Sequence, residues 1–87
     1  MLGKQQTTQL AIEPASEPDP WLARVLKRQI IVHTRSDQSI EGVLMEQSPD
    51  GLILRAAYLL EDNGRKTSIA GETWVPRGNV SFAQLAE

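Results

Sequence analysis

The polar side chains best suited to bind a ligand lie in the stretch Val75–Val80, VPRGNV. Arg77 can hold a phosphate or a base edge, and Asn79 can hydrogen-bond to a base. A second interpretation makes the stretch structural, with Gly78 and Asn79 supplying positive φ angles for a turn and Arg77 pairing with an acidic side chain. The stretch therefore predicts either a turn that contacts an anion or base, or a turn that only connects two strands.

No other residues combine into a catalytic or metal-binding pattern. His33 is the only histidine, there is no cysteine, and the glycines stand singly rather than in a phosphate-binding loop. The acidic residues Asp50, Glu61, Asp62 and Glu72 lack the spacing of metal ligands. We therefore expect a protein that is not an enzyme and that needs neither a cofactor nor a metal.

Composition limits the class of protein further. The chain has 87 residues and a net charge of -2, and residues 21–87 carry equal numbers of basic and acidic side chains. A neutral body argues against strong non-specific nucleic-acid binding, which needs a basic surface. No apolar run approaches the length of a membrane span or a signal segment, so we expect a cytoplasmic protein without membrane contact.

The chain divides into an arm and one small domain. Residues 1–19 are rich in Gln, Thr, Pro and Glu, which predicts an extended or disordered arm. Residues 20–87 form the domain, which begins with a short helix capped by Asp19 and ending near Arg28. Trp21 with Val25, and Leu22 with Leu26, are spaced to share one face of this helix.

Five strands follow the helix. The β-branched and alternating patterns predict strands over 29–34, 39–47, 52–60, 72–75 and 80–85, with a hairpin turn at Asn63-Gly64. Gly42 lies inside the second strand, where a glycine permits a sharp bend. The fold class is thus mainly β, a short helix followed by a strongly bent five-stranded, SH3-like barrel, because only a sheet that closes on itself buries such strands at this size.

This order resembles the Sm-like (LSm) family over about residues 20–86. The segments 30–34 and 40–44 resemble the family's first two strands, with Gly42 as the bend glycine, and 75–80 resembles the link between strands four and five. The Pro76-Arg77 form is closer to bacterial and viral members, and the whole is similar to Sm-like proteins of tailed actinobacterial phages.

The resemblance also implies how copies would assemble. In Sm-like rings the fourth strand of one subunit pairs with the fifth strand of the next. We therefore expect a homo-oligomer, or docking on other structural proteins, with Gly42 and Gly78 in structural roles. The interface residues would be Thr73, Trp74, Val75, Val80 and Phe82.

The RNA-binding residues of the family are matched only in part. RNA-binding members carry an aspartate and an asparagine where this chain has Ser48 and Leu52. The leading hypothesis is therefore a non-enzymatic assembly module, found in a phage virion or in the host cytoplasm. The alternative is an RNA-binding ring that uses Arg77, Asn79 and Asp50 at its pore. A monomeric SH3-like adaptor that binds a peptide ranks third, because the chain has only four aromatic residues.

Overall fold

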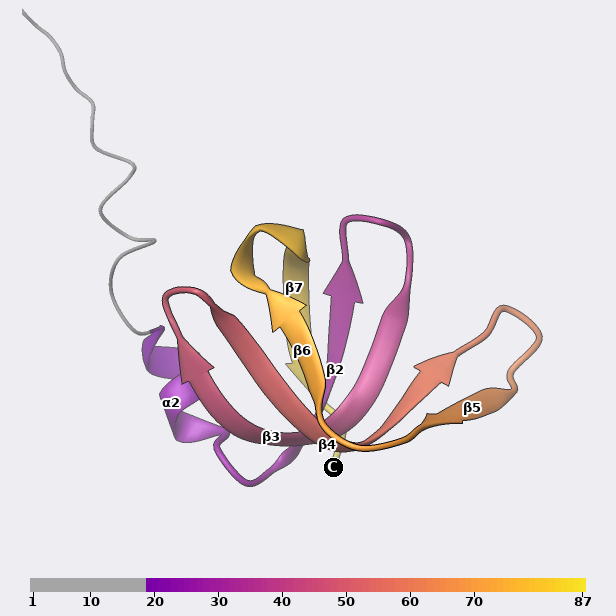
Figure 1. Ribbon diagram of the computed structural model, residues 1–87, viewed down its shortest axis with the longest axis horizontal. Helices are drawn as coiled ribbons and strands as arrows, with labels where there is room; N and C mark the ends of the chain where they lie inside the picture. The colour runs from indigo at the N-terminus through magenta and orange to yellow at the C-terminus, as the bar shows by residue number, and fades with distance from the viewer. Residues whose placement is uncertain (1–18) are drawn as a thin grey trace, which may run out of the picture.

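The computed structural model describes residues 19–87 (Figure 1). The arm predicted for the N-terminal residues lies, except for Asp19, outside the described residues. The elements in chain order are α2 (Pro20–Arg24), β2 (Gln29–Thr34), β3 (Ser39–Ser48), β4 (Gly51–Leu60), β5 (Lys66–Ile69), β6 (Thr73–Pro76), the 3-10 turn η1 (Arg77–Asn79) and β7 (Val80–Leu85). No helix among these residues is long and apolar enough to cross a membrane.

The strands form one antiparallel sheet with the order β5-β4-β3-β2-β7, while β6 pairs with β4. The long strand β4 pairs with two further strands along its length. Its residues Gly51–Leu54 pair with β6, and its residues Ala57–Leu60 pair with β5. The mainly β fold with a bent sheet is confirmed. The sheet has six strands rather than five, because the segment after the predicted hairpin turn at Asn63-Gly64 forms an additional strand, β5. Gly71, which has a φ of 75°, lies between β5 and β6.

The sheet bends partway along the paired strands β3 and β4, and Figure 1 shows both strands curving. The register shifts there, since Glu41 pairs with Tyr58 but Val43 pairs with Arg55. Gly42 lies at the shift, and a Cβ added to it would stand 3.1 Å from the carbonyl oxygen of Arg55. Ala56 takes the extra position in β4 with a φ of 51°, so the bend is a β-bulge.

Helix α2 begins as predicted but is shorter. Asp19 caps it, with Oδ1 accepting hydrogen bonds from the backbone N–H groups of Trp21 and Leu22. The helix ends at Arg24 instead of near Arg28, because Lys27 adopts a φ of 67° and its N–H donates to the carbonyl of Leu44 on β3. The chain therefore leaves the helix early to join the sheet.

The early end changes which helix residues are buried. Leu22 and Val25 enter the core, whereas Leu26 is 38% exposed, so the predicted packing of Leu26 beside Leu22 is wrong. The rest of the core comes from the inner faces of the strands, namely Ile30, Val32, Ile40, Leu44, Leu52, Leu54, Ala57 and Val75, with Trp21 packed against it. Helix α2 and the residue after it thus contribute Leu22 and Val25 to the core of the bent sheet.

Candidate functional site

The turn that contains Arg77 packs against the turn between β3 and β4. The backbone N–H of Arg77 donates to the carbonyl oxygen of Asp50 at 2.8 Å, and its Nη1 donates to the carbonyl oxygen of Ser48 at 3.2 Å. The structure therefore brings Arg77 and Asp50 together, although the contact uses the backbone of Asp50. The Asp50 side chain is exposed.

The carboxylate that Arg77 pairs with comes from the helix cap. Nη2 of Arg77 lies 3.5 Å from Oδ2 of Asp19, and 23% of the arginine side chain is exposed. The sequence predicts an acidic partner for Arg77 but does not identify Asp19, because nothing local links two residues so far apart in the chain. The contact ties η1 to the start of α2.

The link between β6 and β7 does not use positive φ angles. Neither Gly78 nor Asn79 has one, because the two residues belong to a right-handed 3-10 turn, so that part of the prediction is wrong. A Cβ added to Gly78 would meet no atom within 4 Å. The carbonyl oxygen of Asn79 accepts a hydrogen bond from the backbone N–H of Arg35 at 2.8 Å, which holds η1 against the β2–β3 turn.

Within the part of the chain that the structure describes, three strands, β5, β6 and β7, pair on one side only, and η1 links the last two of them. Among residues 19–87, β6 pairs only with β4, and β7 pairs only with β2. Unpaired edges expose backbone donors and acceptors that readily pair with another chain. The side chain of Val75 is 2% exposed and belongs to the core, so only its backbone can contribute to such pairing.

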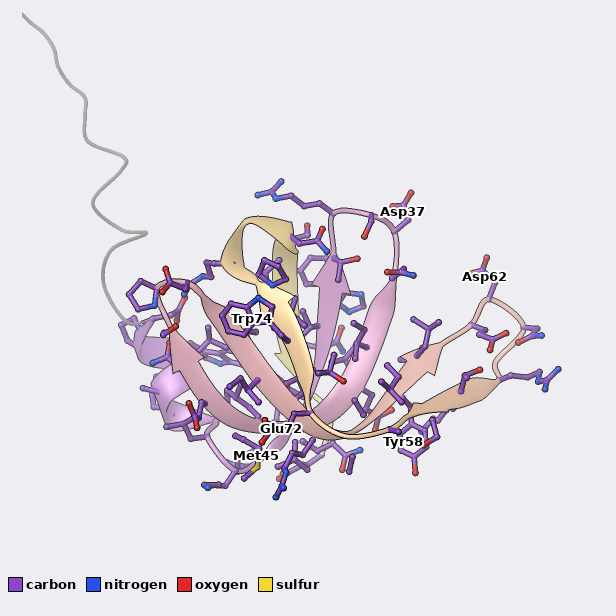
Figure 2. The ribbon with its side chains drawn as sticks, viewed as in Figure 1. Asp37, Met45, Tyr58, Asp62, Glu72 and Trp74 are labelled. Atoms are coloured by element: carbon purple, nitrogen blue, oxygen red, sulfur yellow. The ribbon has the colours of Figure 1, made fainter. Side chains whose placement is uncertain are left out.

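The edge strands β6 and β7 each carry an exposed aromatic side chain on the outer face of the sheet. Trp74 on β6 is 52% exposed and alternates with the buried Val75, and Figure 2 shows it standing on β6. Phe82 on β7 is 57% exposed. It stands opposite His33 of β2, and the two rings stack with centroids 4.3 Å apart. The remaining predicted interface residues, Thr73 and Val80, are partly buried.

His33 lies among polar side chains of neighbouring strands. Its Nε2 hydrogen-bonds to Oε1 of Gln84 at 2.8 Å and its Nδ1 to the hydroxyl of Ser39 at 2.9 Å. Both ring nitrogens are thus engaged by neutral side chains. Within residues 19–87, no three His, Cys, Asp or Glu side chains gather as metal ligands would.

Comparison with known proteins gives structural matches only. No protein-family model and no curated protein matches the chain. The crystal structure of a heptameric archaeal Sm protein is 24% identical and superposes with a TM-score of 0.72, covering 79% of this chain and 100% of that one. The SmAP1 heptamer of P. aerophilum is 25% identical, with a TM-score of 0.70 over 77% of this chain and 89% of that one.

A third match is the Sm protein of Pyrococcus abyssii in complex with a uridine heptamer. It is 18% identical, with a TM-score of 0.70 over 78% of this chain and 99% of that one. These matches establish that the chain has the Sm-like fold. The similarity to phage proteins stays a prediction.

Proposed function

We propose that this chain, with its Sm-like fold, is a subunit of a closed homo-oligomeric ring in which β6 of one copy pairs with β7 of the next. The observation that carries the proposal is the pair of unpaired edges on β6 and β7, each with an exposed aromatic side chain. An interface between two different edges is heterologous, and such an interface closes into a ring when the rotation between copies allows it. The similar archaeal Sm proteins are heptamers.

Edge pairing would also bury the exposed aromatic residues. Side chains on the same face of two paired strands become neighbours. Trp74 and Phe82 both lie on the outer face, so pairing would place the indole of one copy and the Phe82 ring of the next, which already stacks on His33, on the same face of the joined sheet. Large aromatic side chains at the centre of an interface contribute most of its binding energy.

We infer that this ring binds single-stranded RNA through the Arg77 turn. Arg77 presents a guanidinium that donates to the carbonyl of Ser48, while its backbone N–H donates to the carbonyl of Asp50, and Asn79 lies in the same turn. A ring would repeat this group once per subunit, so that weak contacts to successive nucleotides add up. The uridine heptamer bound to the structurally similar Pyrococcus abyssii protein supports RNA as the ligand class.

The second candidate is a ring that serves only as an assembly module, including one in a phage particle. The turn between β3 and β4 favours this second candidate for two reasons. Ser48 stands where the resemblance to the Sm-like family places an RNA-binding aspartate, and the turn has no aromatic residue that could stack on a base. The balanced charge of residues 21–87 favours it as well. Both candidates share the same ring, so they differ only in what the ring binds.

The test measures the binding of a fluorescent uridine decamer to the purified full chain by anisotropy, alongside the solution mass. We expect a ring that binds the RNA, with affinity reduced at least tenfold by Arg77→Ala and unchanged by Arg65→Ala. Arg65 is the matched control because it is an exposed arginine in the β4–β5 hairpin, far from η1 (Figure 1). Equal melting temperatures of the two variants would show that the Arg77 effect is not loss of the fold.

The outcomes separate the two candidates. A ring that ignores the RNA, or one that Arg77→Ala and Arg65→Ala weaken equally, contradicts the RNA-binding site and leaves the assembly module. A monomer contradicts both candidates.

A further inference from the structure

We propose that the Asp19 carboxylate is an internal competitor for the Arg77 guanidinium, so that an incoming RNA phosphate must displace it and Asp19 sets the RNA affinity of the ring. This inference rests on the RNA-binding function proposed above. It assigns to the helix cap a second role, the control of a ligand contact in a turn 58 residues further along the chain.

The two oxygens of the Asp19 carboxylate have separate partners. Oδ1 accepts the hydrogen bond from Trp21 N–H at 2.8 Å and that from Leu22 N–H at 3.2 Å. Oδ2 faces Nη2 of Arg77 at 3.5 Å. The cap therefore holds Oδ2 in front of the arginine without depending on that contact itself.

The ion pair is weak enough for a ligand to displace. The distance of 3.5 Å exceeds that of a charge-assisted hydrogen bond, and 38% of the Asp19 side chain is exposed. Partly exposed single contacts of this kind contribute little, whereas a phosphate can accept two short hydrogen bonds from one guanidinium. Exchange of the carboxylate for a phosphate is therefore favourable, but less favourable than binding to an unpaired arginine.

Arg77 stays in position during such an exchange. Its Nη1 donates to the carbonyl of Ser48 and its backbone N–H to the carbonyl of Asp50, and neither contact involves Asp19. A cavity of about 360 Å³ opens beside the pair, lined by Asp19, Arg77, Trp21 and Val80 among others. A ligand can therefore reach Nη2 from the cavity while the Ser48 carbonyl keeps the guanidinium oriented and the Asp50 carbonyl holds the backbone.

Asp19→Asn separates the two roles of the carboxylate. Asparagine is as good a helix cap as aspartate, because its side-chain oxygen accepts the same backbone hydrogen bonds. It carries no charge, so it does not compete with a phosphate for Arg77. We expect the variant to keep its melting temperature within a few degrees and to bind the uridine decamer about three- to tenfold more tightly at low salt.

Asp62→Asn is the matched control, because it changes the net charge by the same amount. Asp62 lies at the tip of the β4–β5 hairpin, and Figure 2 shows it far from the β6–β7 turn. We expect its affinity for the decamer to equal that of the unmodified chain. A second control combines Asp19→Asn with Arg77→Ala, where removal of the carboxylate should have no effect.

Each outcome decides a different claim. Tighter binding by Asp19→Asn alone supports the competition. Binding by the unmodified chain that Asp19→Asn leaves unchanged overturns the competition and leaves the RNA-binding function intact. An increase that persists in the Arg77→Ala background also overturns it, because the effect then comes from general charge. Absence of binding by both the unmodified chain and Asp19→Asn contradicts the RNA-binding function itself.

Discussion

Ala56 shows how one residue in an unfavourable conformation allows β4 to pair with both β6 and β5. Its φ of 51° lies in the left-handed region, which is costly for any residue with a Cβ. The bulge at this position turns the second half of β4 away from β6 and toward β5. The strain is thus part of the geometry that bends the sheet.

Replacing Ala56 by glycine should therefore stabilise the protein. Relief of the left-handed strain outweighs the extra flexibility of glycine in the unfolded chain, so we expect the free energy of unfolding to rise by about 0.5–1 kcal/mol. Ala57→Gly is the control, since Ala57 is 1% exposed and has no positive φ, and it should lower stability. Urea denaturation of both variants checks this, and a loss of stability in Ala56→Gly would contradict the role given to the bulge.

Glu87 is the residue whose titration the structure predicts. Hydrogen bonds from the Arg28 guanidinium, and then from the backbone N–H of Gln29, hold the pKa of the Glu87 carboxyl below its usual value, and the same pair raises the pKa of Arg28. A carboxyl whose pKa is lowered in the folded state stabilises the fold above its unfolded pKa. That stabilisation is lost as the pH falls through the folded pKa, which lies below the usual value of a glutamate carboxyl.

NMR of the side-chain carboxyl carbons measures this directly. We expect Glu87 to titrate below the usual glutamate range and to shift toward that range in Arg28→Ala, where only the hydrogen bond from the Gln29 N–H still lowers its pKa. A midpoint at the usual value in the unmodified chain would mean that the Arg28–Glu87 contact does not persist in solution.

At the scale of elements, the β3–β4 turn depends on a glycine, whereas η1 does not. A Cβ on Gly51 would come within 2.5 Å of the carbonyl oxygen of Val75 and 2.7 Å of the Trp74 ring, so β4 and β6 could not pair as closely. We expect Gly51→Ala to cost about 1–3 kcal/mol of stability and Gly78→Ala to be nearly neutral, because Gly78 has open space around it. Thermal unfolding compares the two, and equal effects would contradict this difference between the turns.

The free edges make a second prediction at this scale. Trp74→Ala removes the largest exposed side chain from the β6 edge, and we expect it to weaken self-association at least tenfold. Tyr58→Ala is the control, because Tyr58 is also an exposed aromatic residue but lies on β4 beside β5, away from β7 (Figure 2). Sedimentation velocity over a dilution series measures both, and equal dissociation of the two variants would contradict an interface at β6.

The elements also show what the sequence could predict. Strands β2 and β7 lie within the predicted bounds, because β-branched residues and polar turns mark them locally. The end of α2 was not predictable, since it depends on Lys27 in a left-handed conformation and on its hydrogen bond to Leu44 of a distant strand. The Asp19–Arg77 contact was not predictable for the same reason, because only the folded, bent sheet brings the helix cap to η1.

At the scale of the whole molecule, a domain this small has little core of its own. A chain of this length buries only about 60–65% of its unfolded surface, and the described domain leaves Trp74 and Phe82 half exposed at unpaired edges. Pairing between copies would remove both edges and cover both aromatic side chains. The proposed ring therefore joins the sheets of neighbouring copies through β6 and β7 as well as repeating the Arg77 turn.

Light scattering on the purified full chain at micromolar concentration tests this account most directly. We expect a single species with a mass of about seven times the 9.6 kDa of one chain, as in the heptameric Sm proteins of the same fold, and little change on dilution. A single species of 9.6 kDa would contradict the ring, and with it the pairing of β6 with β7.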